Sequence, residues 1–304
     1  MVFIPSDHGP SDHGDSNDNA QPFRFRRSAL FLPASNARAI GKAKTLPADC
    51  VIFDLEDSVA AEARETAHAN LLEQVRGGDF GTRERIIRTP AADDPGFAEA
   101  FEVALQCAPD AILLPKVETP EPLHMASALL AKGKSAAALW IMVETPLALM
   151  NLNDIAACGA PLATLVVGPN DLAKTTGARM QKGRAVMLPW LMQVVAAARA
   201  HRLAVLDGVY NAFRDLEGLA EECAQGAAMG FDGKTLIHPA QIDAANAAFS
   251  PSPEELARAE AIIAAFAKPE NAGKGAIQID GEMVERLHLD EARKLTAAVK
   301  QLQS

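Results

Sequence analysis

Residues 139–171 read LWIMVETPLALMNLNDIAACGAPLATLVVGPND and contain two short apolar runs, Leu139–Val143 and Thr164–Val167. Their apolar residues are consecutive, which is typical of strands buried on both faces of a parallel sheet. Each run ends in residues that can do chemistry, Glu144 after the first and Gly168–Asp171 after the second. The stretch therefore predicts two parallel strands with acids at their carboxyl ends.

The same pattern recurs along the chain from Arg24 onward. Further strands are predicted at Ala29–Leu32, Cys50–Leu55, Arg85–Arg88, Ala111–Leu114, Leu203–Leu206 and Lys234–Ile237. Helical periodicity separates them, as in Ala60–Val75, Phe97–Cys107, Pro120–Leu130 and Val186–Ala200. Eight strands alternating with helices predict an α/β fold of the (β/α)₈ TIM-barrel class, with a doubly wound open sheet as the alternative. No G-x-G-x-x-G follows a strand, which argues against a dinucleotide-binding sheet.

Polar side chains at the strand ends favour the closed barrel. They are Asp54, Glu56, Asp57, Arg88, Lys116, Glu144, Asp171, Asp207 and His238. In a barrel these ends converge on one mouth, where TIM-barrel enzymes keep their active sites. In an open sheet they would be spread along an edge.

Three regions are predicted from composition. Residues 1–22 repeat SDHG and contain no Lys or Arg, so a disordered tail is expected, although His8 and His13 could bind stray metal. Residues 23–250 form the catalytic barrel. Residues 251–304 form a helical extension or lid.

Within the extension, Ser252 and Glu255 form a capping box that opens a helix to about Ala267. A Gly-containing stretch, Asn271–Gly281, follows and is predicted to act as a hinge. The last helix is expected from about Met283 to Leu302.

Charge and composition exclude several classes of protein. Of 304 residues, 49% are hydrophobic, and the net charge of −10 comes from 29 basic and 39 acidic residues, a poor basis for binding nucleic acid. No apolar run approaches the roughly 20 residues of a membrane span, and no secretory signal is visible. The cysteines Cys50, Cys107, Cys158 and Cys223 include no C-x-x-C pair, so free thiols in a reducing cytoplasm are favoured over disulfides.

Glu144 and Asp171 are the central candidate pair. They follow adjacent strands, and two carboxylates with water and substrate oxygens are typical of a Mg²⁺ site. The alternative is that each acid caps a neighbouring helix. Asp54 and Glu56, which alternation places on one side of the chain, could contact metal-bound water, or could favour the start of a helix.

Basic residues suggest contacts to an anionic substrate. Arg88 suits bidentate binding of a carboxylate, pairs with the acids of the second strand, or does both. Lys116 is interpreted as protonated electrostatic support rather than a Schiff-base nucleophile. His238 is either a general base or a hydrogen-bonded structural residue.

The helix after the first strand carries Arg38, Lys42 and Lys44. These bases could hold a phosphate-bearing substrate tail, or they form a solvated helix face.

Seven motifs occur in order between about Arg24 and Leu302. They are Arg27–Pro33 (RSALFLP), Val51–Val59 (VIFDLEDSV), Leu113–Pro120 (LLPKVETP), Val143–Pro146 (VETP), Gly230–Gln241 (GFDGKTLIHPAQ), Ala248–Glu254 (AFSPSPE) and Gly273–Met283 (GKGAIQIDGEM). In these motifs the chain resembles the citrate lyase β-subunit-like members of the HpcH/HpaI aldolase family, which include malyl-CoA and citramalyl-CoA lyases.

The resemblance implies a TIM barrel that binds Mg²⁺, with Mn²⁺ as a possible substitute. It assigns the metal to Glu144 and Asp171, and catalysis to Arg88, Asp54 and Glu285. Substrate contacts are assigned to Arg88, Arg27, Arg38, Lys42 and Pro169, with the first-helix bases at the phosphates of CoA. It also implies a homotrimer or homohexamer in which the C-terminal segment closes over a neighbour's site.

Two positions depart from the family pattern. Asn170 precedes Asp171 where many of these lyases have Glu, which is closer to aldolases acting on free 2-oxo acids. Glu285 stands where malyl- and citramalyl-CoA lyases place an Asp, so the carboxylate is kept on a longer arm.

The resulting prediction is a Mg²⁺-dependent carbon–carbon lyase that cleaves a 3-hydroxy-3-carboxyacyl-CoA thioester into an acyl-CoA and a 2-oxo acid. Three alternatives remain. They are a thioesterase that follows the same enolate chemistry with hydrolysis, an aldolase on free 2-oxo acids, and a citrate lyase β subunit that needs partner subunits.

Overall fold

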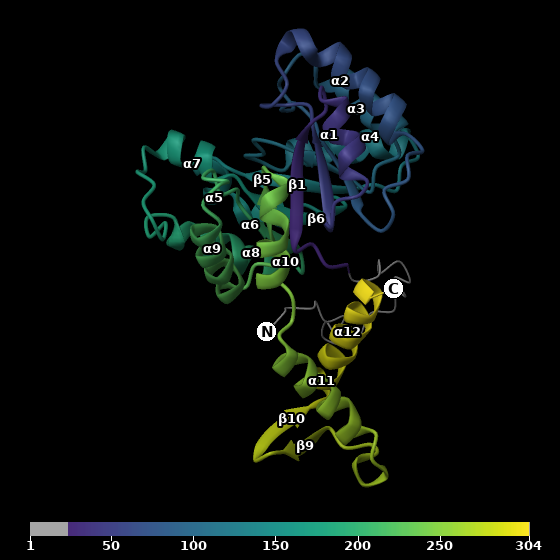
Figure 1. Cartoon of the computed structure of the whole chain (residues 1–304), viewed down its shortest axis with the longest axis vertical. Helices are drawn as coiled ribbons and strands as arrows, with labels where there is room; N and C mark the ends of the chain where they lie inside the picture. The colour runs from purple at the N-terminus through teal and green to yellow at the C-terminus, as the bar shows by residue number, and fades with distance from the viewer. Residues whose placement is uncertain (1–23, 304) are drawn as a thin grey trace. The chain divides into compact units, whose positions relative to one another are not determined.

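The computed structural model describes residues 24–303, so the predicted tail and its His8 and His13 lie outside the described residues. The chain divides into two compact units (Figure 1). One consists of Arg26–Phe249, and the other, among the described residues, combines residues 24–25 with residues 250–303. Each unit has its own hydrophobic core.

The larger unit is a closed barrel of parallel strands, as predicted. The strands are β1 (Ser28–Pro33), β2 (Cys50–Asp54), β3 (Glu84–Arg88), β4 (Ala111–Leu114), β5 (Ala138–Val143), β6 (Leu162–Val167), β7 (Ala204–Asp207) and β8 (Gly233–Leu236). Each strand pairs with its sequence neighbours, and β8 pairs with β1 to close the barrel. This confirms the TIM-barrel prediction over the open sheet.

Helices cover the outside of the strands. They are α1 (Ala37–Ala43), α2 (Arg64–Asn70), α3 (Phe97–Gln106), α4 (Glu121–Lys132), α5 (Pro146–Met150), α6 (Leu152–Ala156), α7 (Pro169–Thr176), α8 (Leu188–Ala200), α9 (Leu216–Met229) and α10 (Ile242–Ala248), with short turns η1 (Ala61–Ala63), η2 (Leu71–Val75) and η3 (Pro239–Gln241). The expected helix Ala60–Val75 is thus η1, α2 and the π-helical turn η2 in succession.

Alternation along each strand separates two cores. On β5, Trp140 and Met142 belong to the cluster inside the barrel, whereas Leu139, Ile141 and Val143 belong to the cluster between strands and helices. Both faces of a strand are therefore apolar, which explains why the strand sequences are continuously hydrophobic.

The smaller unit contains α11 (Pro253–Phe266), η4 (Pro269–Asn271), β9 (Ala276–Ile279), β10 (Glu282–Glu285) and α12 (Arg286–Gln303). The predicted capping box at Ser252 and Glu255 opens α11. β9 and β10 form an antiparallel hairpin where no strands were expected, and the last helix begins at Arg286 rather than at about Met283.

The turn that connects β9 and β10 has a local sequence signal. Asp280 and Gly281 both have positive φ, 50° and 87°, and an Asp-Gly pair is a strong signal for a tight hairpin turn. Ile277 pairs with Val284 across the hairpin, and both side chains are buried in the small core. The Asp-Gly pair therefore favours, from local sequence alone, the hairpin that this segment forms.

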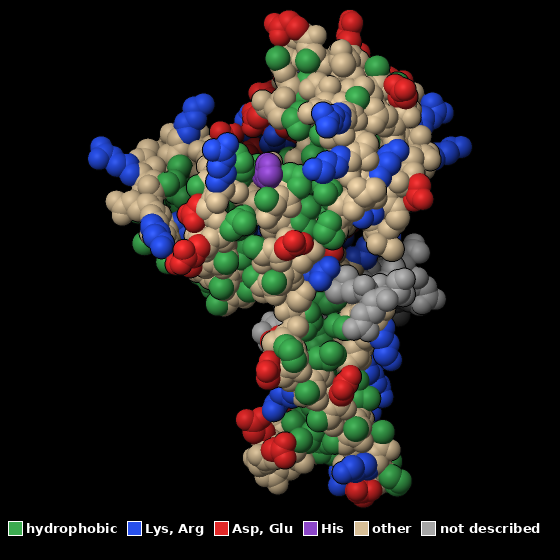
Figure 2. Space-filling model, in the orientation of Figure 1, with side chains coloured by type: hydrophobic (Ala, Val, Ile, Leu, Met, Phe, Trp, Pro, Cys, Tyr) green, Lys and Arg blue, Asp and Glu red, His purple; other side chains and the backbone are tan. Residues whose placement is uncertain are grey.

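The four cysteines are free, as predicted, with Cys50, Cys107 and Cys223 buried. Among residues 24–303 no helix is long and apolar enough to cross a membrane. Figure 2 shows acidic and basic side chains mixed over the visible surface, and hydrophobic side chains along the smaller unit.

Candidate active site

The carboxyl ends of the strands open into a cavity of about 280 Å³, called here the mouth cavity. It is lined by Phe31, Asp54, Asp57, Ser58, Arg88, Met142, Glu144, Val167, Gly168, Pro169, Asn170, Asp171, Val209, Thr235 and Ile237. Six residues singled out in the sequence meet here: Asp54, Asp57, Arg88, Glu144, Pro169 and Asp171.

Arg88, the last residue of β3, is held by acids that follow β2. Its Nε and Nη2 atoms donate to Asp54 Oδ1 and Oδ2 at 2.6 and 2.7 Å, and its Nη1 atom lies 2.7 Å from Glu56 Oε2. Its guanidinium carbon lies 4.9 Å from the ring centroid of Phe31. Burial alone would raise the pKa of Asp54, but hydrogen bonds and the charge of Arg88 lower it. The structure therefore shows Arg88 paired with the strand-2 acids, one of its two predicted roles, and binding of a substrate carboxylate stays a prediction beside it.

Glu144 directly follows β5 and is buried. Its Oε1 atom accepts the backbone N–H of Lys116 at 2.8 Å. Burial, together with the charges of Glu56 and Asp171, raises the pKa of Glu144 to about 7, against the opposing effects of the Lys116 N–H and of Arg88. A carboxylate this costly to ionise is stabilised by a nearby cation.

Asp171 lies in the first turn of α7 and faces the same cavity. Among residues 24–303 no hydrogen bond or ion pair holds its carboxylate, and α7 has no side-chain cap. Helix capping, the alternative for Asp171, is therefore not its role. Glu144 likewise does not cap α5, because Thr145 does so by accepting the N–H of Ala148.

These residues fit a hard divalent cation. Glu144 and Asp171 offer carboxylate oxygens, which are the ligands that Mg²⁺ and Mn²⁺ prefer. The described residues contain no group of three or more His, Cys, Asp or Glu side chains able to hold a metal, so the protein would supply two. Water and substrate would complete the coordination shell, as is usual for Mg²⁺.

Lys116 follows β4 and pairs with the acids of the mouth. Its Nζ atom lies 2.6 Å from Glu56 Oε1. Burial would lower the pKa of the Lys116 ammonium, but the hydrogen bond and charge of Glu56 raise it. The side chain thus stays protonated, in agreement with the predicted electrostatic role.

Arg27, predicted to contact substrate, lies at the opposite end of the barrel. It precedes β1, and its backbone N–H, Nε and Nη2 atoms all donate to the carboxylate of Asp49, which precedes β2. The amino end of a strand cannot reach a site built at the carboxyl ends, so this assignment is wrong.

The first-helix bases are only partly as expected. Arg38 and Lys42 are exposed on α1, and neither lines the mouth cavity. Lys44 lies 5.3 Å from the ring centroid of Phe80, a cation–π contact. Both predicted roles, phosphate binding and a solvated face, are compatible with the exposure of Arg38 and Lys42.

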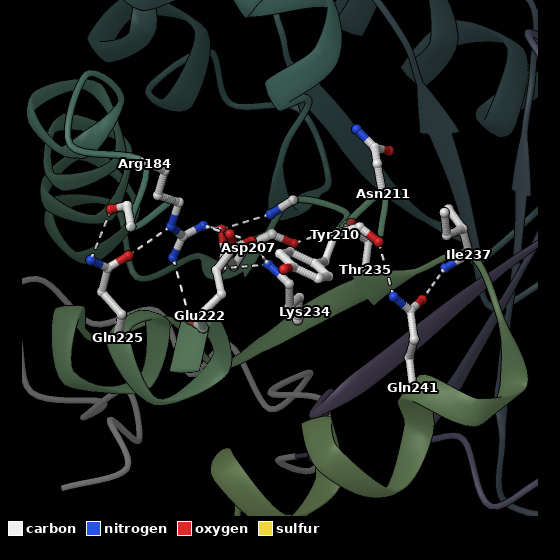
Figure 3. A network of polar contacts seen from close by, with 12 residues as sticks. Arg184, Asp207, Tyr210, Asn211, Glu222, Gln225, Lys234, Thr235, Ile237 and Gln241 are labelled. Carbon is white, nitrogen blue, oxygen red and sulfur yellow. Dashed lines mark hydrogen bonds and ion pairs between the residues drawn. The ribbon is translucent and has the colours of Figure 1, made fainter. Parts of the chain in front are cut away.

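Asp207 does not point into the mouth, although it ends β7. It forms an ion pair of 2.6 Å with Arg184, from the loop before α8, and one of 2.9 Å with Lys234 of β8. Glu222 of α9 completes the group, 2.7 Å from Lys234 (Figure 3). Asp207 therefore faces the helix layer, and its prediction as a mouth residue is wrong.

His238 is a structural residue. Its Nδ1 atom accepts the N–H of Ala240 at 3.1 Å, which caps η3, and its ring stacks on Phe213 at 4.8 Å between centroids. These contacts support the alternative to a general base.

Glu285 ends β10 in the smaller unit and is exposed. Its backbone N–H donates to His288 Nδ1 at 2.9 Å.

Sequence reasoning missed how closely the mouth residues approach one another. Asn170 exchanges amide hydrogen bonds with Asn211, the shorter at 2.7 Å, and nothing in their spacing pointed to this pair. A Cβ on Gly208 would lie 2.2 Å from the Pro169 ring, and one on Gly168 2.5 Å from Glu144 Oε2. Glycine is required at both positions, a signal visible only after folding.

The chain is similar over most of its length to proteins that act on CoA thioesters. The (3S)-malyl-CoA thioesterase of Cereibacter sphaeroides is 45% identical over 278 residues, 91% of this chain and 95% of that protein. The mitochondrial citramalyl-CoA lyase of Homo sapiens is 32% identical over 296 residues, 92% of this chain and 87% of that protein.

A solved structure is similar as well. Protein CitE of Mycobacterium tuberculosis, in complex with magnesium, acetoacetate and coenzyme A, superposes with a TM-score of 0.69 at 28% identity, covering 90% of this chain and 97% of that one. Residues 27–239 match the family model described as HpcH/HpaI aldolase/citrate lyase. The barrel, the motifs and these similarities show that the chain belongs to the HpcH/HpaI aldolase/citrate lyase family.

Proposed function

We propose that the protein is a Mg²⁺-dependent carbon–carbon lyase that cleaves a 3-hydroxy-3-carboxyacyl-CoA thioester of the malyl-, methylmalyl- or citramalyl-CoA kind. The products are acetyl-CoA or propionyl-CoA and a 2-oxo acid such as glyoxylate or pyruvate. The observation that carries the proposal is the excess of buried carboxylate at the mouth, where Glu144 and Asp171 face one cavity beside Arg88.

The residues divide the chemistry between them. Glu144 and Asp171 would hold the ion, which when bound would supply Lewis-acid stabilisation of negative charge on substrate oxygens. Arg88, fixed by Asp54, stabilises negative charge on the oxo-acid half through its remaining N–H groups. The hydroxyl proton leaves to solvent, and the carbon–carbon bond breaks as the carbonyl forms, which leaves the electron pair on the thioester half as an enolate. The thioester enolate then takes up a proton, for which Glu285 of a neighbouring subunit is the donor.

A thioesterase is the second candidate function, because a relative named (3S)-malyl-CoA thioesterase is 45% identical. The two activities differ in products. The lyase releases a 2-oxo acid and leaves the thioester intact, whereas the thioesterase releases free CoA thiol.

A panel of CoA esters with Mg²⁺ tests both functions in one experiment. Release of 2-oxo acid without free thiol supports the lyase, and free thiol without 2-oxo acid supports the thioesterase. Condensation of free aldehydes with pyruvate, without any CoA ester, would favour an aldolase. Activity that requires added partner subunits would favour a citrate lyase β subunit.

We further propose that the enzyme is a trimer or a hexamer in the cytoplasm. The smaller unit places Glu285 at the exposed end of a hairpin, and an apolar groove of about 270 Å³ between α11 and α12 supports a contact with another subunit. The free cysteines support a reducing compartment.

Coassembly tests whether sites are shared. A Glu144→Gln chain and a Glu285→Ala chain, each inactive alone, should regain part of the activity when mixed, because some sites then draw both intact residues from different chains. Mixed oligomers that remain inactive, or a fully active Glu285→Ala enzyme, would contradict shared sites.

A further inference from the structure

We propose that Lys116 is a positioning residue for Glu144 that acts through its backbone rather than through its charge. Its left-handed conformation holds one oxygen of the Glu144 carboxylate and leaves the other for a divalent cation. The inference rests on the metal site of the proposed function and deepens it.

The backbone of Lys116 is unusual. Its φ is +52°, in the left-handed region that residues with a Cβ adopt at a cost and mostly where surrounding structure imposes it. Lys116 is preceded by Pro115, at the end of β4. In this conformation its N–H reaches Glu144 Oε1, the only hydrogen bond to that carboxylate that the described residues provide.

Glu144 is confined from the other side by Gly168. A Cβ there would lie 2.4 Å from Glu144 Cβ and 2.5 Å from Oε2, so only glycine leaves that oxygen room. Among the described residues the carboxylate thus accepts a hydrogen bond at Oε1 and none at Oε2, and Glu144 lines the mouth cavity, so Oε2 keeps its lone pairs for a cation.

The side chain of Lys116 contacts a different acid from the one that its backbone contacts. Its Nζ atom lies 2.6 Å from Glu56 Oε1, and Glu56 Oε2 lies 2.7 Å from Arg88 Nη1. The ammonium therefore holds Glu56, while the backbone holds Glu144. Substitutions can separate these two contributions, because glycine and asparagine tolerate positive φ without an ammonium, and valine does not tolerate it.

The molecule offers a matched control. Lys134 is also a lysine with φ of +52°, but it is exposed, precedes β5 at the opposite end of that strand from Glu144, and donates its N–H to Ala131. Lys134→Val carries the same change of residue and the same backbone conflict, away from the mouth cavity.

The test measures Mn²⁺ binding by the full-length chain without substrate, from the electron paramagnetic resonance signal of the free ion, together with the thermal unfolding temperature. Lys116→Val should weaken Mn²⁺ binding by about tenfold or more, the usual loss when a group that orients a metal ligand is removed. Lys116→Gly and Lys116→Asn should retain the wild-type affinity to within about threefold, since both keep the N–H in place. Lys134→Val should lower the unfolding temperature about as much as Lys116→Val, with unchanged Mn²⁺ affinity.

The outcomes separate the possible errors. Wild-type affinity in Lys116→Val, or a tenfold loss in both Lys116→Gly and Lys116→Asn, would overturn the backbone role. If Lys116→Val does not fold, the glycine and asparagine variants still decide. A wild-type chain that binds no Mn²⁺ would overturn the metal site and this inference together. The expected Mn²⁺ pattern without turnover of CoA esters would count against the proposed reaction alone.

Discussion

The barrel unit contains two charged clusters, one at the mouth and one between β7, β8 and the surrounding helices, and they differ in charge balance. The mouth cluster contains the acids Asp54, Glu56, Glu144 and Asp171 against the bases Arg88 and Lys116. The buried network contains Asp207 and Glu222 against Arg184 and Lys234 (Figure 3).

Burial favours the neutral form of the acids in both clusters, but the final pKa shifts of Asp207 and Glu144 have opposite directions. In the network, burial alone would raise the pKa of Asp207, but Lys234 and Arg184 lower it. In the mouth, burial and neighbouring acids raise the pKa of Glu144 to about 7. A balanced buried cluster is complete in itself and stabilises packing. A cluster with excess carboxylate costs stability and is suited to hold a cation, so the imbalance distinguishes the site from the scaffold.

The largest expected effect tests the mouth cluster. Glu144→Gln should reduce lyase activity by about a thousandfold or more, because the Lewis acid contributes several kcal/mol to catalysis. Steady-state assays across a Mg²⁺ titration would measure the loss. Unchanged activity and Mg²⁺ dependence would contradict the assignment.

The same variant should be at least as stable as the wild type without metal. A carboxyl whose folded pKa is above its unfolded value stabilises fully below the unfolded pKa, and this stability is lost as pH rises through the folded pKa, here between about 4.5 and about 7. Glu144→Gln removes that loss, so chemical denaturation of the metal-free protein at pH 8 should show a higher free energy of unfolding. A marked destabilisation would place Glu144 with the scaffold.

The second prediction tests the buried network. Lys234→Met should lower the free energy of unfolding by about 3–5 kcal/mol, because the buried Asp207 and the partly buried Glu222 then share one partner, Arg184. Urea denaturation at neutral pH would measure it. Mn²⁺ affinity in the protein that remains folded should be little changed, and loss of metal binding without loss of stability would reverse the assignment of the two clusters.

The third prediction concerns the rigid partner of the mouth acids. Arg88→Lys keeps the charge but loses the planar fork that contacts both oxygens of Asp54, so it should cost about 1–3 kcal/mol of substrate or transition-state binding. The ratio of kcat/KM between wild type and variant gives this value directly. Wild-type kinetics would show that the fork has no catalytic role.

The smallest effect is expected at an exposed ion pair beside the network. Lys182 lies 3.0 Å from Glu221 of α9, one position before the glutamate that pairs with Lys234, but both side chains are exposed. Solvent screens such pairs, so Lys182→Ala should leave the thermal unfolding temperature unchanged within error. A shift as large as that of Lys234→Met would show that burial is not what separates the two pairs.

Most of the barrel was predictable from the sequence. The eight strands are where their apolar runs predicted them, since strands buried on both faces must be hydrophobic throughout. Glu144 and Asp171 were predictable as a pair because they follow adjacent parallel strands, whose carboxyl ends lie side by side. The hairpin turn at Asp280–Gly281 was predictable as well, because an Asp-Gly pair favours a tight turn with positive φ.

What only the tertiary structure decided is which way each polar side chain faces and which partner it finds. Asp207 ends a strand just as Arg88 does, yet it faces the helices, where Arg184 and Lys234 lie 23 and 27 positions away along the chain. The spacing and composition of the sequence predict neither the left-handed conformation of Lys116 nor the close approach of Glu144 to Gly168. Local sequence determines where strands begin and end, because periodicity and turn chemistry are local. Charge pairing and close approach depend on register and on contacts between distant segments, and these exist only once the barrel has closed.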